Sequence, residues 1–128
     1  MRIAVDFDGT IVKHIYPKVG CGVEIPGAID TLRYLQGKGC KVSLWTSRAG
    51  YQLIEAVEFC TSKGLTFDSI NCNADDTRPY GVPKMVADVY IDDRSWHWCL
   101  DDANEGWKPC DLTESAWKWI KQQIDRRL

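Results

Sequence analysis

The sequence predicts an α/β protein, a single Rossmann-like three-layer domain with a mostly parallel sheet. Short apolar segments alternate with segments of helical periodicity, and the strand–helix–strand steps are long enough for crossovers. The chain has 128 residues, 45% hydrophobic and 27% charged, which suits one globular domain over residues 1–128. This composition excludes a disordered or collagen-like chain.

Four apolar segments are expected to form the strands. The first is residues 3–7 (IAVDF), the second residues 42–45, and the fourth residues 86–91, which are rich in β-branched and aromatic side chains. Residues 69–72 form a weaker third strand. Right-handed crossovers between these strands predict a mostly parallel sheet that is covered on both faces.

Three helices are expected between and after the strands. The first follows Pro26 and ends at residues 37–39, and the second stops at Gly64. The third opens at Asp111, with Glu114 at capping-box spacing. The apolar residues expected on the core faces of these helices are Ile29, Leu32, Leu35, Leu53, Ile54, Val57, Cys60, Ala116, Ile120 and Ile124.

Two segments interrupt the alternation of strands and helices: the flap, residues 11–25, and the tryptophan-rich residues 95–110. Residues 11–25 contain Pro17, Gly20 and Gly22, and they are expected to form a small hairpin or flap over a strand end. The flap is too short to be a second domain.

The C-terminal segment, residues 95–128, is rich in tryptophan. Trp117 and Trp119 lie two residues apart on the third helix, so they cannot both face the core and at least one is expected to be exposed. An exposed tryptophan is typical of an interface. A homo-oligomer formed through this segment and simple packing of a small domain are the two alternatives.

Charge and cysteine usage narrow the class of protein further. A formal net charge of -2 gives no whole-chain case for binding nucleic acid or an anionic membrane, although a local basic patch is not excluded. No apolar run reaches the ~20 residues of a membrane span. Six scattered cysteines without a CxxC pair indicate reduced thiols and a cytoplasmic protein. A disulfide framework is the alternative.

Polar side chains follow three of the four strands where each strand ends. Asp6 and Asp8 lie at the end of the first strand, residues 46–48 (TSR) follow the second, and Asp92 and Asp93 follow the fourth. Ligands of open parallel sheets bind beyond these carboxyl ends, so the side chains are expected to converge. Clustered carboxylates need a compensating cation, and oxygen ligands suit Mg²⁺. Ordinary turns and helix caps are the alternative for each segment alone.

Hydroxyl and cationic side chains complete the predicted site. Thr46 and Ser47 end an apolar strand, and Lys84 is placed to reach towards the carboxylates; a surface lysine is the alternative. A metal, a lysine and a hydroxyl around a nucleophilic carboxylate have the parts to transfer a phosphoryl group. Arg48 could contact substrate or form a salt bridge with the surplus acids. His14 is expected to have a surface or packing role.

Four motifs in order carry a resemblance to a known family. The sequence resembles the haloacid dehalogenase-like hydrolase superfamily, whose first motif DxDGT is present as residues 6–10. Thr46, Lys84 and the pair Asp92–Asp93 match the other three motifs, and the resemblance spans residues 3–94.

The resemblance implies a function and a role for each site residue. Asp6 is expected to attack phosphorus and form an aspartyl-phosphate, and Asp8 to act as general acid and base. The phosphoryl oxygens are expected to be bound by Thr46, Ser47 and Lys84. Mg²⁺ would be held by Asp6, the Asp8 carbonyl and Asp92, with Asp93 as a direct, water-mediated or outer partner. An acid at position 8 argues against dehalogenase chemistry.

The sequence leaves no room for the cap domain that many members of the superfamily carry. For a capless member of this superfamily, the resemblance implies an open site with a macromolecular substrate, or with a small one enclosed by a neighbouring subunit. The leading hypothesis is therefore a capless Mg²⁺-dependent phosphatase of phosphate monoesters. The alternatives are a phosphatase acting on nucleic-acid or protein phosphate, and a non-catalytic metal- or phosphate-binding regulatory module.

Overall fold

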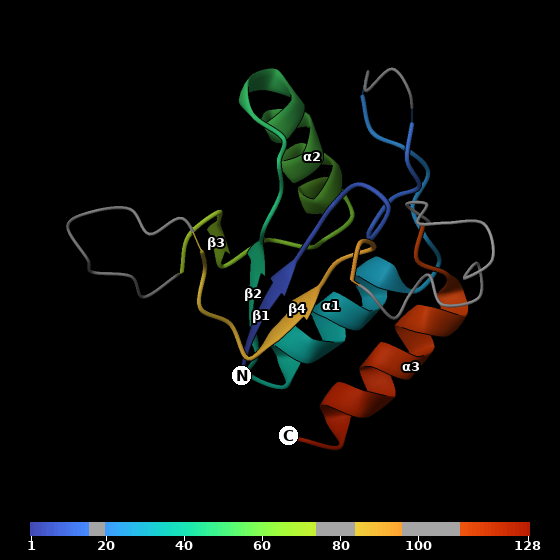
Figure 1. The fold of residues 1–128 in the computed structure, drawn as a ribbon, viewed down its shortest axis with the longest axis vertical. Helices are drawn as coiled ribbons and strands as arrows, with labels where there is room; N and C mark the ends of the chain where they lie inside the picture. The colour runs from blue at the N-terminus through green and yellow to red at the C-terminus, as the bar shows by residue number, and fades with distance from the viewer. Residues whose placement is uncertain (16–19, 74–83, 96–110) are drawn as a thin grey trace.

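The computed structural model describes residues 1–15, 20–73, 84–95 and 111–128. The elements in chain order are β1 (Arg2–Val5), α1 (Ala28–Gly37), β2 (Lys41–Leu44), α2 (Gly50–Ser62), β3 (Ser69–Ile70), β4 (Val89–Ile91) and α3 (Glu114–Asp125). The strands form one parallel sheet in the order β3-β2-β1-β4 (Figure 1). The α/β class with a parallel sheet is therefore confirmed.

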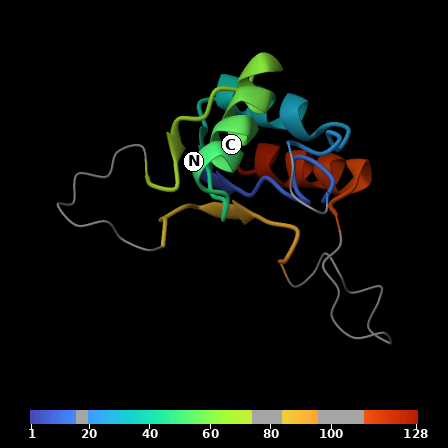
Figure 2. The same ribbon diagram turned by 90° about the horizontal axis from the view of Figure 1, so that it is seen from above.

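One face of the sheet carries the hydrophobic core. Ile3 and Val5 of β1 lie in register with Val42 and Leu44 of β2, and side chains two apart on a strand share a face. All three helices lie on this side of the sheet (Figure 2). Their buried side chains join the strand residues in one cluster: Ala28, Ile29, Leu32, Leu35, Ala56, Cys60, Trp117, Ile120 and Ile124.

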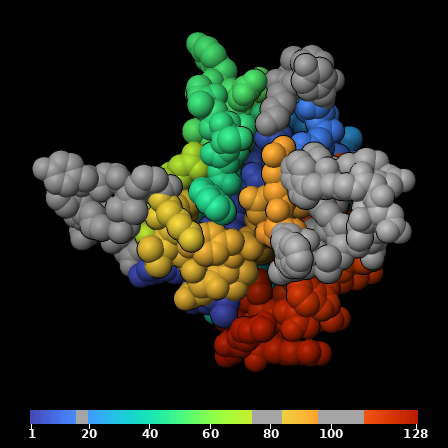
Figure 3. All heavy atoms as spheres, viewed as in Figure 1, coloured from blue at the N-terminus to red at the C-terminus, as the bar shows by residue number. Residues whose placement is uncertain are grey.

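The opposite face of the sheet carries Ala4, Ser43 and Tyr90. Residues 84–88 lie against it (Figure 3). Met85 of this segment is buried, and its carbonyl accepts a hydrogen bond from the Tyr90 hydroxyl. In the described part of the chain, the third layer expected from the sequence is formed by this segment instead of a helix. This path explains why β4 begins at residue 89 and not at residue 86.

The structure differs from the sequence expectation at two positions on the helices. Ile54, expected to face the core, is 51% exposed. Thr113, and not Asp111, caps α3, because the Thr113 hydroxyl accepts a hydrogen bond from the Ala116 N–H. The Asp111 carboxylate instead accepts a hydrogen bond from the backbone N–H of His14.

The structure describes both ends of the flap and both tryptophans of α3. Val12 and Glu24 form an antiparallel bridge, so the two ends of segment 11–25 pair as a hairpin does. Trp117 is fully buried, whereas Trp119 is 49% exposed.

The cysteines of the described residues are the free thiols Cys21, Cys40, Cys60 and Cys72. The described helices include none with the length and apolar character to cross a membrane. Outside the described residues lie Trp96, His97, Trp98, Cys99, Trp107 and Cys110.

Candidate active site

The strand order places the end of β1 between the ends of β2 and β4. The Trp45 N–H donates to the Val5 carbonyl at 2.8 Å, and the Asp6 N–H donates to the Ile91 carbonyl at 2.9 Å. Asp6 therefore begins the loop just beyond the sheet, flanked by the residues that follow its two neighbouring strands.

A pocket of about 440 Å³ lies at this edge of the sheet. In Figure 3 it opens between the green-cyan atoms that follow β2 and the orange atoms that follow β4. Two of the site residues predicted from the sequence, Arg48 and Lys84, do not line it. The lining residues are Asp6, Asp8, His14, Trp45, Thr46, Ser47, Asp92, Asp93 and Arg94.

Three carboxylates of this pocket lie close enough to share a metal ion. Asp6, Asp92 and Asp93 each offer an oxygen, and these oxygens lie within 4.8 Å of one another. Around Mg²⁺, whose ligands lie at about 2.1 Å, oxygens are separated by about 3–4 Å, so a small closure of the cluster accommodates the ion. An all-oxygen donor set fits Mg²⁺ better than it fits zinc or copper.

The carboxylates perturb one another strongly. Burial raises the pKa of Asp6 from 3.8 to about 8, with further contributions from the Asp92 charge and a hydrogen bond with Asp93. Burial also raises the pKa of Asp93, which is 1% exposed. The cluster therefore favours protons on its carboxyl groups in the absence of a cation, and a divalent cation would replace them.

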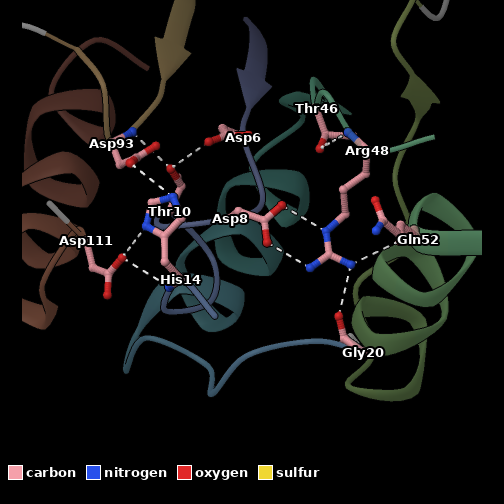
Figure 4. A network of polar contacts seen from close by, with 10 residues as sticks. All are labelled: Asp6, Asp8, Thr10, His14, Gly20, Thr46, Arg48, Gln52, Asp93 and Asp111. Carbon is pink, nitrogen blue, oxygen red and sulfur yellow. Dashed lines mark hydrogen bonds and ion pairs between the residues drawn. The ribbon is translucent and has the colours of Figure 1, made fainter. Parts of the chain in front are cut away.

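The DxDGT loop turns back on itself directly after Asp8. Gly9 has a φ of +79°, a left-handed conformation that favours glycine. The Thr10 hydroxyl then lies between two carboxylate residues: it accepts from the Asp93 N–H at 3.0 Å and donates to Asp6 Oδ2 at 3.4 Å (Figure 4). This bridge holds the loop after β1 against the loop after β4.

The C-terminal part of the chain braces the same loop. The Leu112 N–H donates to the Gly9 carbonyl at 2.7 Å. The buried indole N–H of Trp117 donates to the Thr10 carbonyl at 2.8 Å. No local pattern in the sequence reports a contact across 107 residues, so a contact between α3 and the site was not expected.

His14 is a pocket residue that the sequence analysis assigned to a surface or packing role. Its Nδ1 lies 2.7 Å from an Asp111 oxygen, and its Nε2 lies 3.7 Å from Asp93 Oδ2 (Figure 4). A Cβ on Gly9 would lie only 2.2 Å from the His14 ring, so the glycine also makes room for the imidazole. The one sequence signal is the position of His14 in the flap, four residues after the DxDGT threonine.

Arg48 forms an ion pair with Asp8. Its Nε and Nη2 donate to the two Asp8 oxygens at 2.8 and 2.7 Å, and both residues are buried. Hydrogen bonding to Asp8 raises the pKa of Arg48. Of the two roles that the sequence left open for Arg48, the salt bridge is the one present in the structure.

The predicted phosphate-binding residues fall into two groups. Thr46 and Ser47 line the pocket, and the Thr46 hydroxyl accepts a hydrogen bond from the Arg48 N–H at 3.1 Å. Lys84 is exposed, and its ammonium lies 5.7 Å from the centroid of the Tyr90 ring. Its phosphate-binding role stays a prediction that requires the side chain to move towards the pocket.

The comparisons with known proteins identify a relative but no activity. No protein-family model matches the chain, and no curated protein matches it. A solved structure of a conserved protein from Bacteroides thetaiotaomicron is 36% identical, with a TM-score of 0.79, and the match covers 100% of this chain and 92% of that protein. At this identity and coverage, the chain belongs to the same family as this conserved Bacteroides protein.

Proposed function

We propose that this protein is a Mg²⁺-dependent phosphatase of the haloacid dehalogenase-like superfamily, which hydrolyses a phosphate monoester through an aspartyl-phosphate. The observation that carries the proposal is the convergence of Asp6, Asp92 and Asp93 within 4.8 Å, in one pocket with the hydroxyls of Thr46 and Ser47. An ordinary turn or helix cap does not account for acids gathered from two separate strand ends.

The reaction proceeds in two displacements at phosphorus. In the first, an Asp6 oxygen forms a bond to phosphorus, the phosphorus–oxygen ester bond breaks, and the leaving oxygen takes a proton from Asp8. In the second, water attacks the aspartyl-phosphate, Asp8 accepts the proton of the water, and inorganic phosphate and free Asp6 are released. Asp6, Asp92 and Asp93 would hold the Mg²⁺, which would supply positive charge to offset the phosphoryl oxygens beside the carboxylates.

Side chains around the pocket provide the remaining recognition. Thr46 and Ser47 line the pocket, and their hydroxyls would donate hydrogen bonds to phosphoryl oxygens. Arg94 also lines the pocket, and it adds positive charge to a lining rich in acids. A rearranged Lys84 would contribute in the same way.

One observation favours the non-catalytic alternative, a metal- or phosphate-binding module. Both oxygens of Asp8 accept hydrogen bonds from Arg48, and an ion pair of this kind favours the ionised carboxylate. That form suits proton acceptance in the second displacement, but it has to take up a proton before it can serve as the acid in the first. A binding module needs neither step.

The proposal extends to partners and location. The pocket walls come from the flap and from short loops of the described residues, so phosphate carried by a nucleic acid or a protein is the alternative substrate class. The half-exposed Trp119 is available for contact between copies of the chain. Free thiols suit a cytoplasmic enzyme.

Phosphate release from a broad panel of substrates tests the proposal. The panel contains phosphorylated metabolites, nucleotides, a phosphopeptide and a 3′-phosphorylated oligonucleotide, each with and without Mg²⁺. We expect metal-dependent release that disappears in Asp6→Asn. We expect Asp8→Asn to lose turnover while it keeps metal and phosphate affinity. No release by the wild type above the Asp6→Asn background would favour the binding module.

A further inference from the structure

Arg48 has too few unused donors to serve as a substrate ligand. Besides the two bonds to Asp8, its Nη1 donates to the Gly20 carbonyl at 3.0 Å and to the Gln52 carbonyl at 3.2 Å. A guanidinium has five N–H donors, and four of them are used within the protein. The Arg48 side chain is also buried, with its guanidinium carbon 4.9 Å from the centroid of the Phe7 ring.

The partners of Arg48 come from three separate parts of the fold. Asp8 belongs to the DxDGT loop, Gly20 to the flap, and Gln52 to the first turn of α2, and Figure 4 shows all three converging on one guanidinium. The bidentate contact fixes the plane of the Asp8 carboxylate, which a single-point contact would not do. A shift of the flap carbonyl or of α2 is thereby passed to Asp8 through a rigid planar group.

We propose that Arg48 is a positioning residue that sets the orientation of the Asp8 carboxylate and couples it to the flap through Gly20. The inference rests on the proposed phosphatase function, in which Asp8 delivers a proton to the leaving oxygen. A displacement of about 1 Å in a group of this kind costs on the order of 100-fold in rate. Arg48 thus acts through Asp8 and does not touch the substrate.

The test compares two substrates that differ in their need for Asp8. The leaving group of 4-nitrophenyl phosphate departs without protonation, whereas that of a primary alkyl phosphate requires it. The ratio of their kcat/KM values reports the proton-donating step alone, since any loss of folded protein lowers both values equally.

Two substitutions perturb the network, each with a matched control. Arg48→Lys keeps the charge but removes the bidentate geometry, and Arg33→Lys makes the same exchange at an exposed position of α1. Gly20→Ala strains the flap backbone, where φ is +74°, and the added Cβ meets no atom of the described residues within 4 Å. Gly39→Ala does the same at a φ of +93° in the turn before β2. The glycine pair remains informative where Arg48→Lys fails to fold.

We expect Arg48→Lys to raise the aryl-to-alkyl ratio by at least about tenfold, and Gly20→Ala to raise it by about threefold. Both controls are expected to leave the ratio within about twofold of the wild type. An active wild type whose ratio stays unchanged in Arg48→Lys and Gly20→Ala would overturn the positioning role alone. A wild type that releases no phosphate from these two substrates or from any substrate of the broad panel in the presence of Mg²⁺ would overturn the proposed function, and the positioning role with it.

Discussion

Mg²⁺ binding to the acidic cluster should depend steeply on pH, because the ion has to displace a proton from Asp6. The pKa of Asp6 is raised to about 8, so at pH 6 and 7 the metal-free protein holds this carboxyl group mainly in its protonated form. Each unit of pH below the pKa then weakens Mg²⁺ binding by about tenfold, or about 1.4 kcal/mol. The apparent Kd should therefore fall by up to about 100-fold between pH 6 and pH 8 and level off above that range.

Isothermal titration calorimetry measures both parts of this prediction. Titrations at several pH values give the apparent Kd, and titrations at pH 7 in two buffers of different ionisation enthalpy give the number of protons released per ion bound. We expect release of about one proton from Asp6 at pH 7. The variant Asp6→Asn has no carboxyl group to titrate at this position, and its weaker binding should show a smaller pH dependence. A wild-type Kd that stays constant from pH 6 to pH 8 would refute the reasoning.

Three further predictions concern stability, measured by urea unfolding without metal. The free energy of unfolding should fall as pH rises from about 4 to about 8, by up to about 1.4 kcal/mol per pH unit. The reason is that the raised pKa of Asp6 makes the folded state bind more protons than the unfolded state in this pH range. A free energy that does not change with pH, or a pH dependence that is the same in Asp6→Asn, would contradict this. Trp117→Phe removes the donor to the buried Thr10 carbonyl and should cost about 1–3 kcal/mol, whereas a change within experimental error would show that the brace contributes nothing. Gly9→Ala should destabilise more than Gly39→Ala, since both have positive φ but only a Cβ at Gly9 would meet the His14 ring; equal losses would rule out the steric contribution.

The part of the site that the sequence could predict is the part set by strand ends. Asp6 and Asp92 each directly follow a short apolar segment, and parallel strands bring their carboxyl ends to one edge of the sheet. The meeting of these strand ends can be predicted without knowing the path of the loops. It accounts for the correct placement of the acids and of Thr46 in one pocket.

The parts that could not be predicted depend on where loops and distant segments settle. His14 reaches the pocket only because Asp111, 97 residues away in the chain, holds its ring. Arg48 binds Asp8 and not a substrate because carbonyls of the flap and of α2 accept hydrogen bonds from its guanidinium. Lys84 has the expected spacing from Asp92, yet its segment passes over the sheet and the side chain lies over Tyr90. No local periodicity or motif in the sequence predicts these three side-chain positions.

The hydrogen bond from Trp117 to Thr10 has a consequence for the order in which the protein can become functional. During synthesis, a chain that has emerged as far as Asp93 already contains Asp6, Asp8, Asp92 and Asp93, the carboxylates that line the pocket among the described residues. The DxDGT loop nevertheless lacks its indole donor until α3 has been made and docked, and the contact spans 107 residues. Contacts of such sequence separation form late and slow the folding of small domains. The nascent chain should therefore acquire a competent metal site only in the last stage of its maturation.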